Sequence, residues 1–501
     1  MQKGKKTKRI LFTIITIFFI FITSACSNNT NGQASVKNSN NNNASKPVEL
    51  TFYYPLAQIP ADVSTVEAEI NKITKGKINA TVHLKPQTFS DYTQKMNVVL
   101  ASGGDADIIW TSNWNFDYVT NQAKGAFLPL DDLIKKYAPE VKNTLPQYVM
   151  DATKINGKMY AIPNYQIETQ KVGFYIQKRF ADKYHFDPSS IKTIKDIEPL
   201  LASIKQGESK EVVPLAMSSI GNWDHLLLAY NLEKIQDKLL VINYNDPTKI
   251  LNMYETPEFE QYLEMVRDWY KKGYINQDAA TIKNVNDLLK TGNVAVQIHN
   301  VLKPGAEIAQ KNANGGQDII QAAVTKPHVL TNSIITTMLA INQKSHNPEA
   351  AMKFINLLNT DKQLYNLICY GVEGKNYTKI SDNMIKINPD AGYNPNANWV
   401  FGNTFNSFLK EGEDPKVNEQ TLEMNKTAIP SPILGFKFVA EPVTAEIANL
   451  QTVIDQYLPG LVTGTVDPKS KLKEFRDKLK EAGIDKVVAE GQKQLDKFLR
   501  K

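Results

Sequence analysis

The sequence predicts an α/β protein with two lobes and a helical C-terminal part. Most of the 501 residues follow residue 47, and a stretch of that length exceeds what one hydrophobic core usually organises. Strand-like and helix-like segments alternate from Val48 onward, which is the pattern of sheets covered by helices. The segment after Thr444 is mostly helical in its pattern. We therefore expect a mixed sheet flanked by helices in each lobe.

The first five elements alternate between strand and helix. We expect strands at 48–54, 78–84 and 107–110, with helices at 62–76 and 89–101 between them. Asp62 is suited to cap the first helix, and Gly76 to end it. This order is typical of a parallel sheet, in which the ligand-binding loops lie at the carboxyl ends of the strands.

The later elements continue the alternation. The strongest helical pattern runs from Pro257 to Lys271 and ends at Gly273, with Trp269 on its apolar face as a core residue. Strands are expected at 292–298 and 336–341, and helices at 347–358, 444–457, 468–481 and 485–499.

The N-terminus has the layout of an export signal. Five cations precede an apolar run from Ile10 to Ile22, and Thr23-Ser24-Ala25 leads to Cys26. The apolar run is shorter than the roughly 20 residues of a transmembrane helix. Cys26 in this position resembles the lipobox of bacterial lipoproteins, although Thr23 stands where leucine is usual; the alternative is a cut elsewhere, with Cys26 an ordinary residue. We expect a signal peptide over 1–25, a diacylated Cys26 and a cell-membrane location facing outward.

The rest of the chain is close to electrically neutral. Subtracting the five cations before Cys26 from the net charge of +6 leaves about +1, so the charge gives no indication of a nucleic-acid partner. Residues 26–47 are rich in Asn and Ser and predict a flexible tether. With Cys26 lipid-modified, Cys369 has no partner, so we expect a buried thiol and no disulfide.

Motifs for catalysis or metal binding are missing from the sequence. The six histidines are dispersed without metal-ligand spacing, and no nucleophile elbow or phosphate loop occurs. No pair of carboxylates stands out as the two groups that a glycoside hydrolase needs. We therefore expect no enzymatic activity, no metal and no cofactor, and keep a membrane-anchored, glycan-active enzyme as an alternative.

Four separate stretches carry a resemblance to a known family. They are Gly104–Trp110, Asn156–Pro163, Lys290–Ala295, and Ala340–Asn342 continued by Pro348–Phe354. In their order and spacing they are similar to the extracellular solute-binding proteins of bacterial ABC importers, family 1, the group related to maltose-binding protein. Ala106 departs from the proline that is usual in the first stretch. The C-terminal stretches 399–403, 431–436 and 482–486 further resemble a Firmicute lipoprotein subgroup often called LipO-like.

The resemblance implies a two-lobed periplasmic-binding-protein-like fold of type II. It places the first lobe at 48–161 plus 329–369 and the second at 165–321 plus 378–501, with hinge crossings near 162–164, 323–327 and 370–377. It further implies a monomer that captures a carbohydrate, an oligosaccharide, between the lobes and delivers it to the transmembrane permease subunits. A ligand sensor or an adhesin with the same fold is the other alternative.

A sugar site needs flat aromatic rings for the C–H faces and planar polar groups for the hydroxyls. In the first lobe, Trp114 and Asn113 follow a strand and are the leading candidates. Trp110 is held in reserve, since a core role is equally compatible with its position, and Tyr165 follows the first crossing.

The expected second-lobe contacts are polar groups and two further tryptophans. They are Trp223, Asp224, His299, Asn300 and Trp399. Asp224 has the alternative role of a helix cap.

Overall fold

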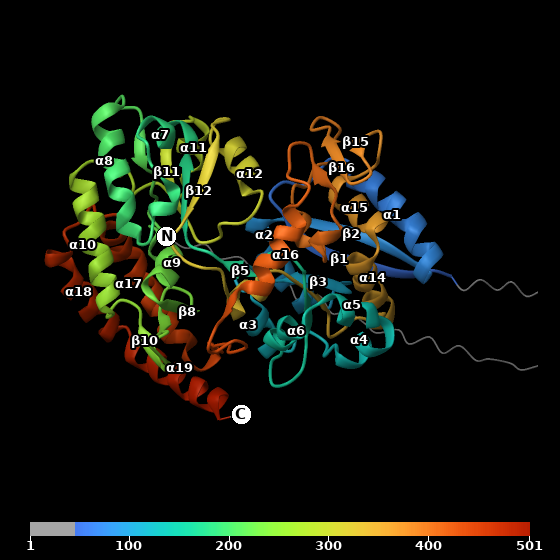
Figure 1. The fold of residues 1–501 in the computed structure, drawn as a ribbon. Coiled ribbons are helices and arrows are strands. Elements are labelled where there is room, and N and C mark those ends of the chain that lie inside the picture. The colour runs from blue at the N-terminus through green and yellow to red at the C-terminus, as the bar shows by residue number, and fades with distance from the viewer. Residues whose placement is uncertain (1–45, 501) are drawn as a thin grey trace, which may run out of the picture. The chain divides into compact units, whose positions relative to one another are not determined.

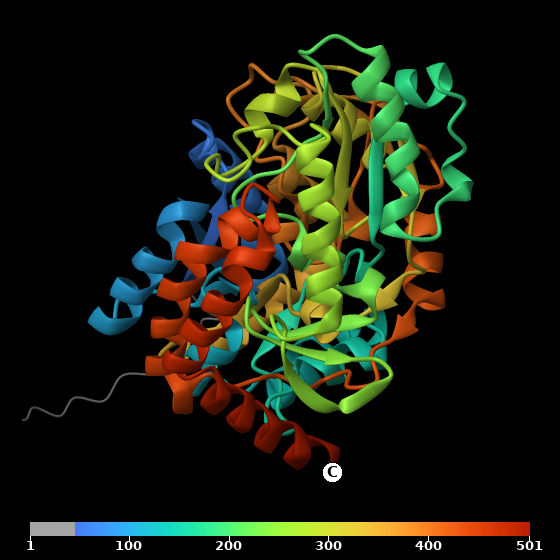
Figure 2. The same cartoon turned by 90° about the vertical axis from the view of Figure 1, so that its left-hand side faces the viewer.

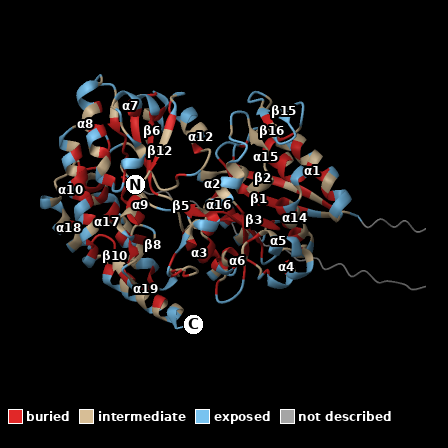
Figure 3. Ribbon diagram, viewed as in Figure 1, coloured by how far each residue is buried: buried red, intermediate tan, exposed pale blue. Residues whose placement is uncertain are grey.

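The computed structural model describes residues 46–500. The predicted signal peptide, Cys26 and all of the tether but its last two residues lie outside this range. Two large hydrophobic cores organise the described residues, one in each lobe. The residues coloured as buried in Figure 3 lie in the interior of both lobes.

The first lobe is built on a five-stranded sheet of order β2-β1-β3-β14-β4. Its strands are β1 (Val48–Leu56), β2 (Ala80–Thr88), β3 (Ile108–Thr111), β4 (Ala161–Pro163) and β14 (Met338–Ile341). β1 pairs in parallel with β2 and β3, whereas β14 is antiparallel to β3 and β4. The carboxyl ends of the four other strands therefore meet the amino end of β14 at one edge of the sheet.

Helices surround this sheet (Figure 1). They are α1 (Val63–Ile78), α2 (Phe89–Ser102), α3 (Tyr118–Ala123), α4 (Asp131–Tyr137), α5 (Pro139–Thr144), α6 (Gln147–Thr153), α14 (Pro348–Thr360) and α15 (Lys362–Tyr370). α1 runs two residues beyond Gly76, because Asn79 supplies the left-handed C-cap in place of the glycine.

The second lobe contains a four-stranded sheet of order β12-β6-β11-β7 and an antiparallel sheet of order β10-β9-β8. The strands are β6 (Gly173–Gln177), β7 (Val213–Leu215), β8 (Leu232–Gln236), β9 (Leu240–Asn243), β10 (Asp246–Asn252), β11 (Val294–His299) and β12 (Ile319–Ala323). The helices are α7 (Lys178–Lys183), α8 (Glu198–Gly207), α9 (Trp223–Leu226), α10 (Pro257–Lys271), α11 (Asn286–Lys290) and α12 (Ala306–Ala313).

Three C-terminal helices complete the second lobe: α17 (Thr444–Val462), α18 (Pro468–Glu481) and α19 (Ile484–Leu499). Figure 2 shows them in red beside α10, in the green-yellow part of the chain. α17 extends five residues beyond the predicted end and contains Pro459. None of the helices within 46–500 has both the length and the apolar character needed to cross a membrane.

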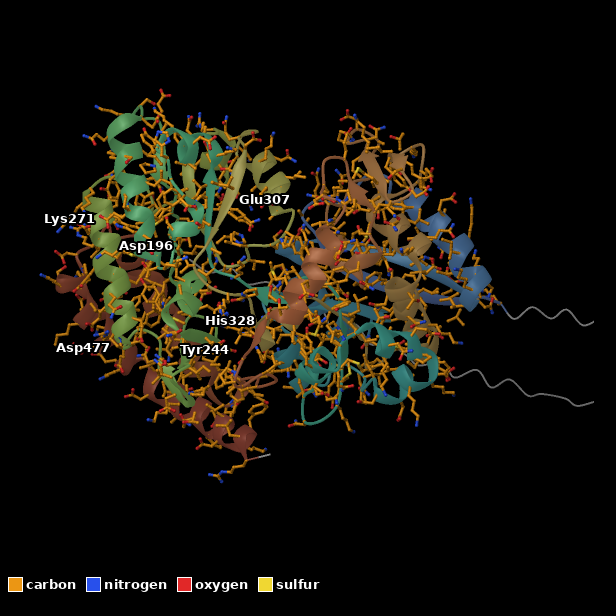
Figure 4. The ribbon with its side chains drawn as sticks, viewed as in Figure 1. Asp196, Tyr244, Lys271, Glu307, His328 and Asp477 are labelled. Atoms are coloured by element: carbon orange, nitrogen blue, oxygen red, sulfur yellow. The ribbon has the colours of Figure 1, made fainter. Side chains whose placement is uncertain are left out.

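A small sheet lies where the chain passes between the lobes. It consists of β5 (Thr169–Gln170), β13 (His328–Val329) and β18 (Ile429–Pro430), in the order β18-β13-β5. The short helix α13 (Thr331–Ile334) follows β13, and α16 (Val417–Thr427) precedes β18. Figure 4 shows the side chain of His328 from β13 next to that of Tyr244, with ring centroids 5.8 Å apart.

The lobe boundary after residue 370 differs from the expected one. Residues 377–401, expected almost entirely in the second lobe, contribute Tyr377, Ile385, Tyr393 and Phe401 to the first core. Phe401 packs edge-on against Tyr54, at 5.0 Å between centroids, so this segment covers β1. The third passage therefore runs through α16 to β18 rather than through 370–377. Within this region β15 (Tyr377–Ser381), β16 (Met384–Ile387) and β17 (Leu409–Lys410) form a separate sheet.

Asn425 fixes α16 to the first crossing segment. Its side-chain amide donates to the carbonyl of Gln166 at 2.7 Å and accepts from the backbone N–H of Glu168 at 3.0 Å. It is the buried residue of an otherwise solvated helix. Two passages that are distant in sequence are thus held together by one amide side chain.

Candidate functional site

At one end of the first sheet, the carboxyl ends of four strands lie beside the amino end of β14. Aromatic side chains project from this end. Phe89 directly follows β2, and Trp114 follows β3 by three residues. Trp399 reaches the same edge from the 3-10 turn Asn398–Val400. We call Phe89, Trp114 and Trp399 the aromatic platform.

The platform is a contiguous set of rings with an open face. Phe89 stacks on Trp399 at 5.7 Å between centroids and 7° between planes. Trp114 lies 5.5 Å from Phe89 and 6.3 Å from Trp399. Trp114 remains 52% exposed, although monomeric proteins tend to cover such large apolar groups. The exposed part of the Trp114 ring is therefore available to a ligand.

Trp110 supports the platform from below rather than forming part of its surface. Its side chain is fully buried, and its ring meets Trp114 edge-on at 5.6 Å. The indole N–H donates to Thr337 Oγ1 at 2.7 Å. The hydroxyl of Thr337 donates in turn to the carbonyl of Trp399. Trp110 is thus a core residue, which corrects its reserve place among the candidate contacts.

The loop that carries Trp114 is fixed by local hydrogen bonds. Ser112 Oγ accepts from the backbone N–H groups of Trp114 and Asn115 at 3.2 and 2.8 Å. The indole N–H of Trp114 donates to the carbonyl of Thr336 at 2.9 Å, and the Asn115 amide donates to the carbonyl of Phe89. The orientation of the exposed ring is therefore set before any ligand binds.

A cavity of about 420 Å³ lies beside the platform and is lined by both lobes. Asn113 and Trp114 line it from the first lobe, and Gln170, Lys234, Asn300 and Lys437 line it from the crossing and the second lobe. The side-chain amides of Gln170 and Asn300 have no hydrogen-bond partner within residues 46–500. They can therefore bind ligand hydroxyls without breaking an existing bond.

Hydrogen bonds already join the two lobes across this cavity. The Asn113 amide donates to the carbonyl of Asn332 in α13 at 2.9 Å, and the Asn332 amide donates to the carbonyl of Lys234 in β8 at 2.9 Å. The Asn113 amide is therefore occupied by a bond to α13, and Asn332 of α13 makes the bond that reaches the second lobe.

Two titratable groups lie in or next to the second-lobe wall of the cavity: Glu233 lines it, and His299 directly precedes the lining residue Asn300. Burial raises the pKa of Glu233 to about 7, and burial, with a smaller contribution from His225, lowers the pKa of His299 to about 4. His299 Nδ1 accepts from the N–H of Val301 at 3.0 Å. The imidazole is thus neutral at physiological pH and tied to its own loop.

Lys234, which lines this cavity, forms an ion pair with Asp224. Lys234 Nζ lies 2.6 Å from Asp224 Oδ2 and 3.1 Å from Asp237 Oδ1. A small cavity of about 30 Å³ adjoins them, and Asp224 Oδ1, His225 Nδ1 and Glu233 Oε2 lack partners in the described part of the chain. A space of this size and polarity fits one water molecule.

Trp223 and Tyr165, two further candidate contacts, are buried. Trp223 is 2% exposed and packs between Phe259 and Tyr262 at 5.2 and 5.3 Å, because α9 turns its apolar face into the second core. Tyr165 is buried against Phe405, 4.9 Å away. Both belong to the core, which corrects their expected role as contacts.

Of the candidate set, the structure brings Trp114, Asn113, Asn300 and Trp399 to one region. It adds Phe89 and Gln170, which the sequence reasoning missed. Phe89 had a detectable signal, because it follows the capping residue Thr88 at a strand end. Gln170 had none, since its place depends on the pairing of β5 with β13.

The described residues hold neither a metal cluster nor an exposed thiol. Within residues 46–500 no cluster of His, Cys, Asp and Glu side chains is arranged to hold a metal ion. Cys369 is buried, and burial strongly raises the pKa of its thiol. The region therefore presents binding groups, namely aromatic rings, free amides and an ion pair.

Comparison with known proteins gives matches along nearly the whole chain. A carbohydrate ABC transporter substrate-binding protein of Streptococcus pneumoniae is 30% identical over 490 residues, covering 95% of each chain. Lipoprotein LipO of Bacillus subtilis is 24% identical over 350 residues, covering 64% of this chain and 65% of the relative. Residues 432–500 match a domain of unknown function.

A solved structure has the same fold. The N-glycan transport solute binding protein of Streptococcus pneumoniae superimposes with a TM-score of 0.79 at 28% identity, covering 90% of this chain and 99% of that one. This confirms the two-lobed type II fold. Residues 57–364, more than half of the chain, match the model of a family described as bacterial extracellular solute-binding protein. The chain therefore belongs to the bacterial extracellular solute-binding protein family.

Proposed function

We propose that this solute-binding protein captures a carbohydrate, an oligosaccharide, between its lobes. The observation that carries the proposal is the aromatic platform beside unpaired amides. Trp114 offers an exposed ring for the apolar face of a sugar, and Gln170 and Asn300 offer donors and acceptors for its hydroxyls. The relatives named for carbohydrate and N-glycan transport support the same ligand class.

Ligand capture involves a change in the angle between the lobes. The three passages converge on the sheet of β5, β13 and β18, and short strands of two residues each are suited to absorb a hinge motion. A ligand that contacts the platform and Asn300 together binds the closed form better and shifts the population toward it.

The bound sugar is delivered to the transmembrane permease of an ABC importer. The protein acts as a monomer held at the outer face of the cell membrane by lipid on Cys26. Two acyl chains suffice for stable anchoring, whereas one gives only reversible binding. The similarity to a lipoprotein supports this anchoring.

Two other roles use the same features and predict different results. A glycan-active enzyme would convert its ligand, and it requires a carboxylate pair across the scissile bond; Asp224 in this wall is paired to Lys234. A sensor or an adhesin would bind the same sugar without supporting its uptake. We favour transport, because the relatives are named as transporter components.

A glycan panel tests the proposal. The purified protein is titrated with neutral and acidic saccharides of one to nine units while tryptophan fluorescence and melting temperature are recorded. A ligand at a hundredfold excess over its Kd should stabilise the fold by about 2.7 kcal/mol. The recovered glycan should be unchanged by mass spectrometry. A panel without any response would refute sugar binding, and a cleaved product would favour the enzyme.

A further inference from the structure

A second cavity, of about 590 Å³, lies between α6 and the C-terminal end of α19. Its walls include the turn Lys154–Gly157 and the segment Leu434–Val439. Val119, Phe436 and Lys437 line both this cavity and the smaller one beside the aromatic platform. The larger cavity therefore adjoins the proposed sugar site without including any platform residue.

The charges around this cavity are unbalanced. Three lysines line it, Lys154, Lys437 and Lys497, against one carboxylate, Asp151. Asp151 is already paired, since its Oδ1 lies 2.6 Å from Lys154 Nζ. The ammonium groups of Lys437 and Lys497 have no carboxylate partner within residues 46–500. The cavity is thus lined by two lysines that have no counter-ion among the described residues.

Lys437 is held in place at the junction of the two cavities. Its Nζ donates to the carbonyls of Lys154 and Gly435 at 2.8 and 3.1 Å, and its neighbours Phe436 and Phe438 are buried in the second core. An ammonium has three donors, so one remains for a ligand. Burial lowers the pKa of Lys437 to about 7, and a bound anion would offset that cost.

The remaining lining is apolar and partly aromatic. Tyr148, Phe436 and Phe498 provide rings, and Gln494 and Asn156 provide amides. Apolar faces next to unpaired cations fit a sugar ring that has an acidic substituent. A simple inorganic ion would leave most of the volume unfilled.

We propose that this cavity binds the anionic substituent of an acidic saccharide, carboxylate or phosphate, through Lys437 and Lys497. The proposal rests on the proposed sugar-binding function and specifies its ligand further. A saccharide lying on the platform would extend past Phe436 and place its acidic unit between these two lysines.

Matched pairs of ligands test the charge requirement by calorimetry at low salt. Sialyllactose is compared with lactose, cellobiouronic acid with cellobiose, and glucose 6-phosphate with glucose, so that the carboxylate and phosphate arms are separate. At least one acidic member should bind about tenfold more tightly than its neutral partner, as expected for one charge-assisted hydrogen bond. Inorganic phosphate alone serves as a further probe.

Variants locate the effect in the cavity. Lys497→Met should remove most of the acidic preference and leave neutral ligands unaffected, and Lys497→Glu should reverse the preference. Lys473→Met is the matched control, because Lys473 is 87% exposed on α18 and paired with Asp477.

Chemical labelling of the wild-type protein gives a readout that needs no Lys437 variant. Limited acetylation of the free protein should modify both Lys437 and Lys473, as measured by peptide mass mapping. Adding the acidic saccharide should reduce acetylation of Lys437 and leave that of Lys473 unchanged.

Three outcomes overturn the proposal. Acidic ligands that bind no more tightly than their neutral partners would refute it and leave the sugar-binding function intact. An acidic preference unchanged in Lys497→Glu, with Lys437 unprotected, would place the anion elsewhere. Protection of Lys437 by inorganic phosphate as strong as by any saccharide would assign the site to a free anion. If no saccharide of either kind binds, the proposed function itself fails.

Discussion

Replacing Trp114 with alanine should weaken oligosaccharide binding about tenfold while the protein stays folded. An aromatic side chain of this size presents up to about 250 Å² of surface, and Trp114 leaves 52% of its surface open. A sugar that covers half of that open area buries about 60 Å² of it. At about 25 cal/mol per Å² this contributes roughly 1.5 kcal/mol, which is a factor of about ten in Kd.

The measurement is a calorimetric titration of both proteins with a glycan that binds the wild type. Ile380→Ala is the matched control, because Ile380 is 50% exposed on β15, away from the platform, and should leave Kd unchanged. Loss of the ring contacts to Phe89 and Trp399 should lower the free energy of unfolding by about 1–2 kcal/mol. An unchanged Kd would refute the assignment of the platform, and a Trp114→Ala protein that no longer unfolds cooperatively would make this tryptophan a core residue.

Three further expectations concern the crossing and the anchor. Burial raises the pKa of Glu168 to about 8, above its unfolded value. The folded state therefore holds a proton that the unfolded state loses, and the free energy of unfolding falls as pH rises from about 4.5 to about 8. Glu168→Gln should flatten this dependence in melting curves recorded from pH 5 to 8.5, and an unchanged slope would contradict the prediction. Asn425→Ala leaves the buried N–H of Glu168 without its acceptor and should lower the free energy of unfolding by about 1–3 kcal/mol in urea titrations, whereas Asn425→Asp, which retains an acceptor, should lose less. Cys26→Ala should release the protein from membranes in cell fractionation, and full retention would exclude a lipid anchor.

The local elements of the first lobe were predictable because their signals lie within the sequence. Strand, helix and strand follow one another from Val48, and this order predicts that these strands run in parallel, although Asp62 makes no side-chain capping bond to the first helix. The sheet in turn places its carboxyl ends at one edge, which is why Trp114 was identified. Phe89 follows from the same rule, since it comes directly after β2.

Tertiary packing decided the positions that sequence reasoning placed incorrectly. Trp114 and Trp223 stand in nearly identical settings, each next to an asparagine at the start of a short helical or turn segment. One is half exposed and the other is buried among Phe259 and Tyr262. The difference comes from α10, whose aromatic face covers Trp223, and a pairing of helices so far apart in sequence has no local signal.

The third passage was misplaced for a related reason. Residues 377–401 read as polar loops with scattered apolar residues, which gave no indication of the lobe they complete. Phe401 nevertheless lies in the first core, where its ring contacts those of Phe52 and Tyr54 at 6.4 and 5.0 Å between centroids. Residues 377–401 thus pack on the first lobe, although the chain was expected to have entered the second lobe by then. Their place depends on contacts with residues distant in sequence.

The two lobes present different chemistry, and under the proposed hinge motion this division would determine which ligands close the protein. The aromatic platform belongs to the first lobe and is fixed in orientation by Ser112 and Thr336. The unpaired amide of Asn300 belongs to the second lobe, on the loop after β11. A molecule that only stacks on the platform has equal affinity for the open and closed forms, so it does not change the ratio of their populations. Closure therefore depends on polar groups of the ligand that reach the second lobe. Ring stacking contributes affinity for sugars in general, and the pattern of hydroxyls determines which sugars favour the closed form.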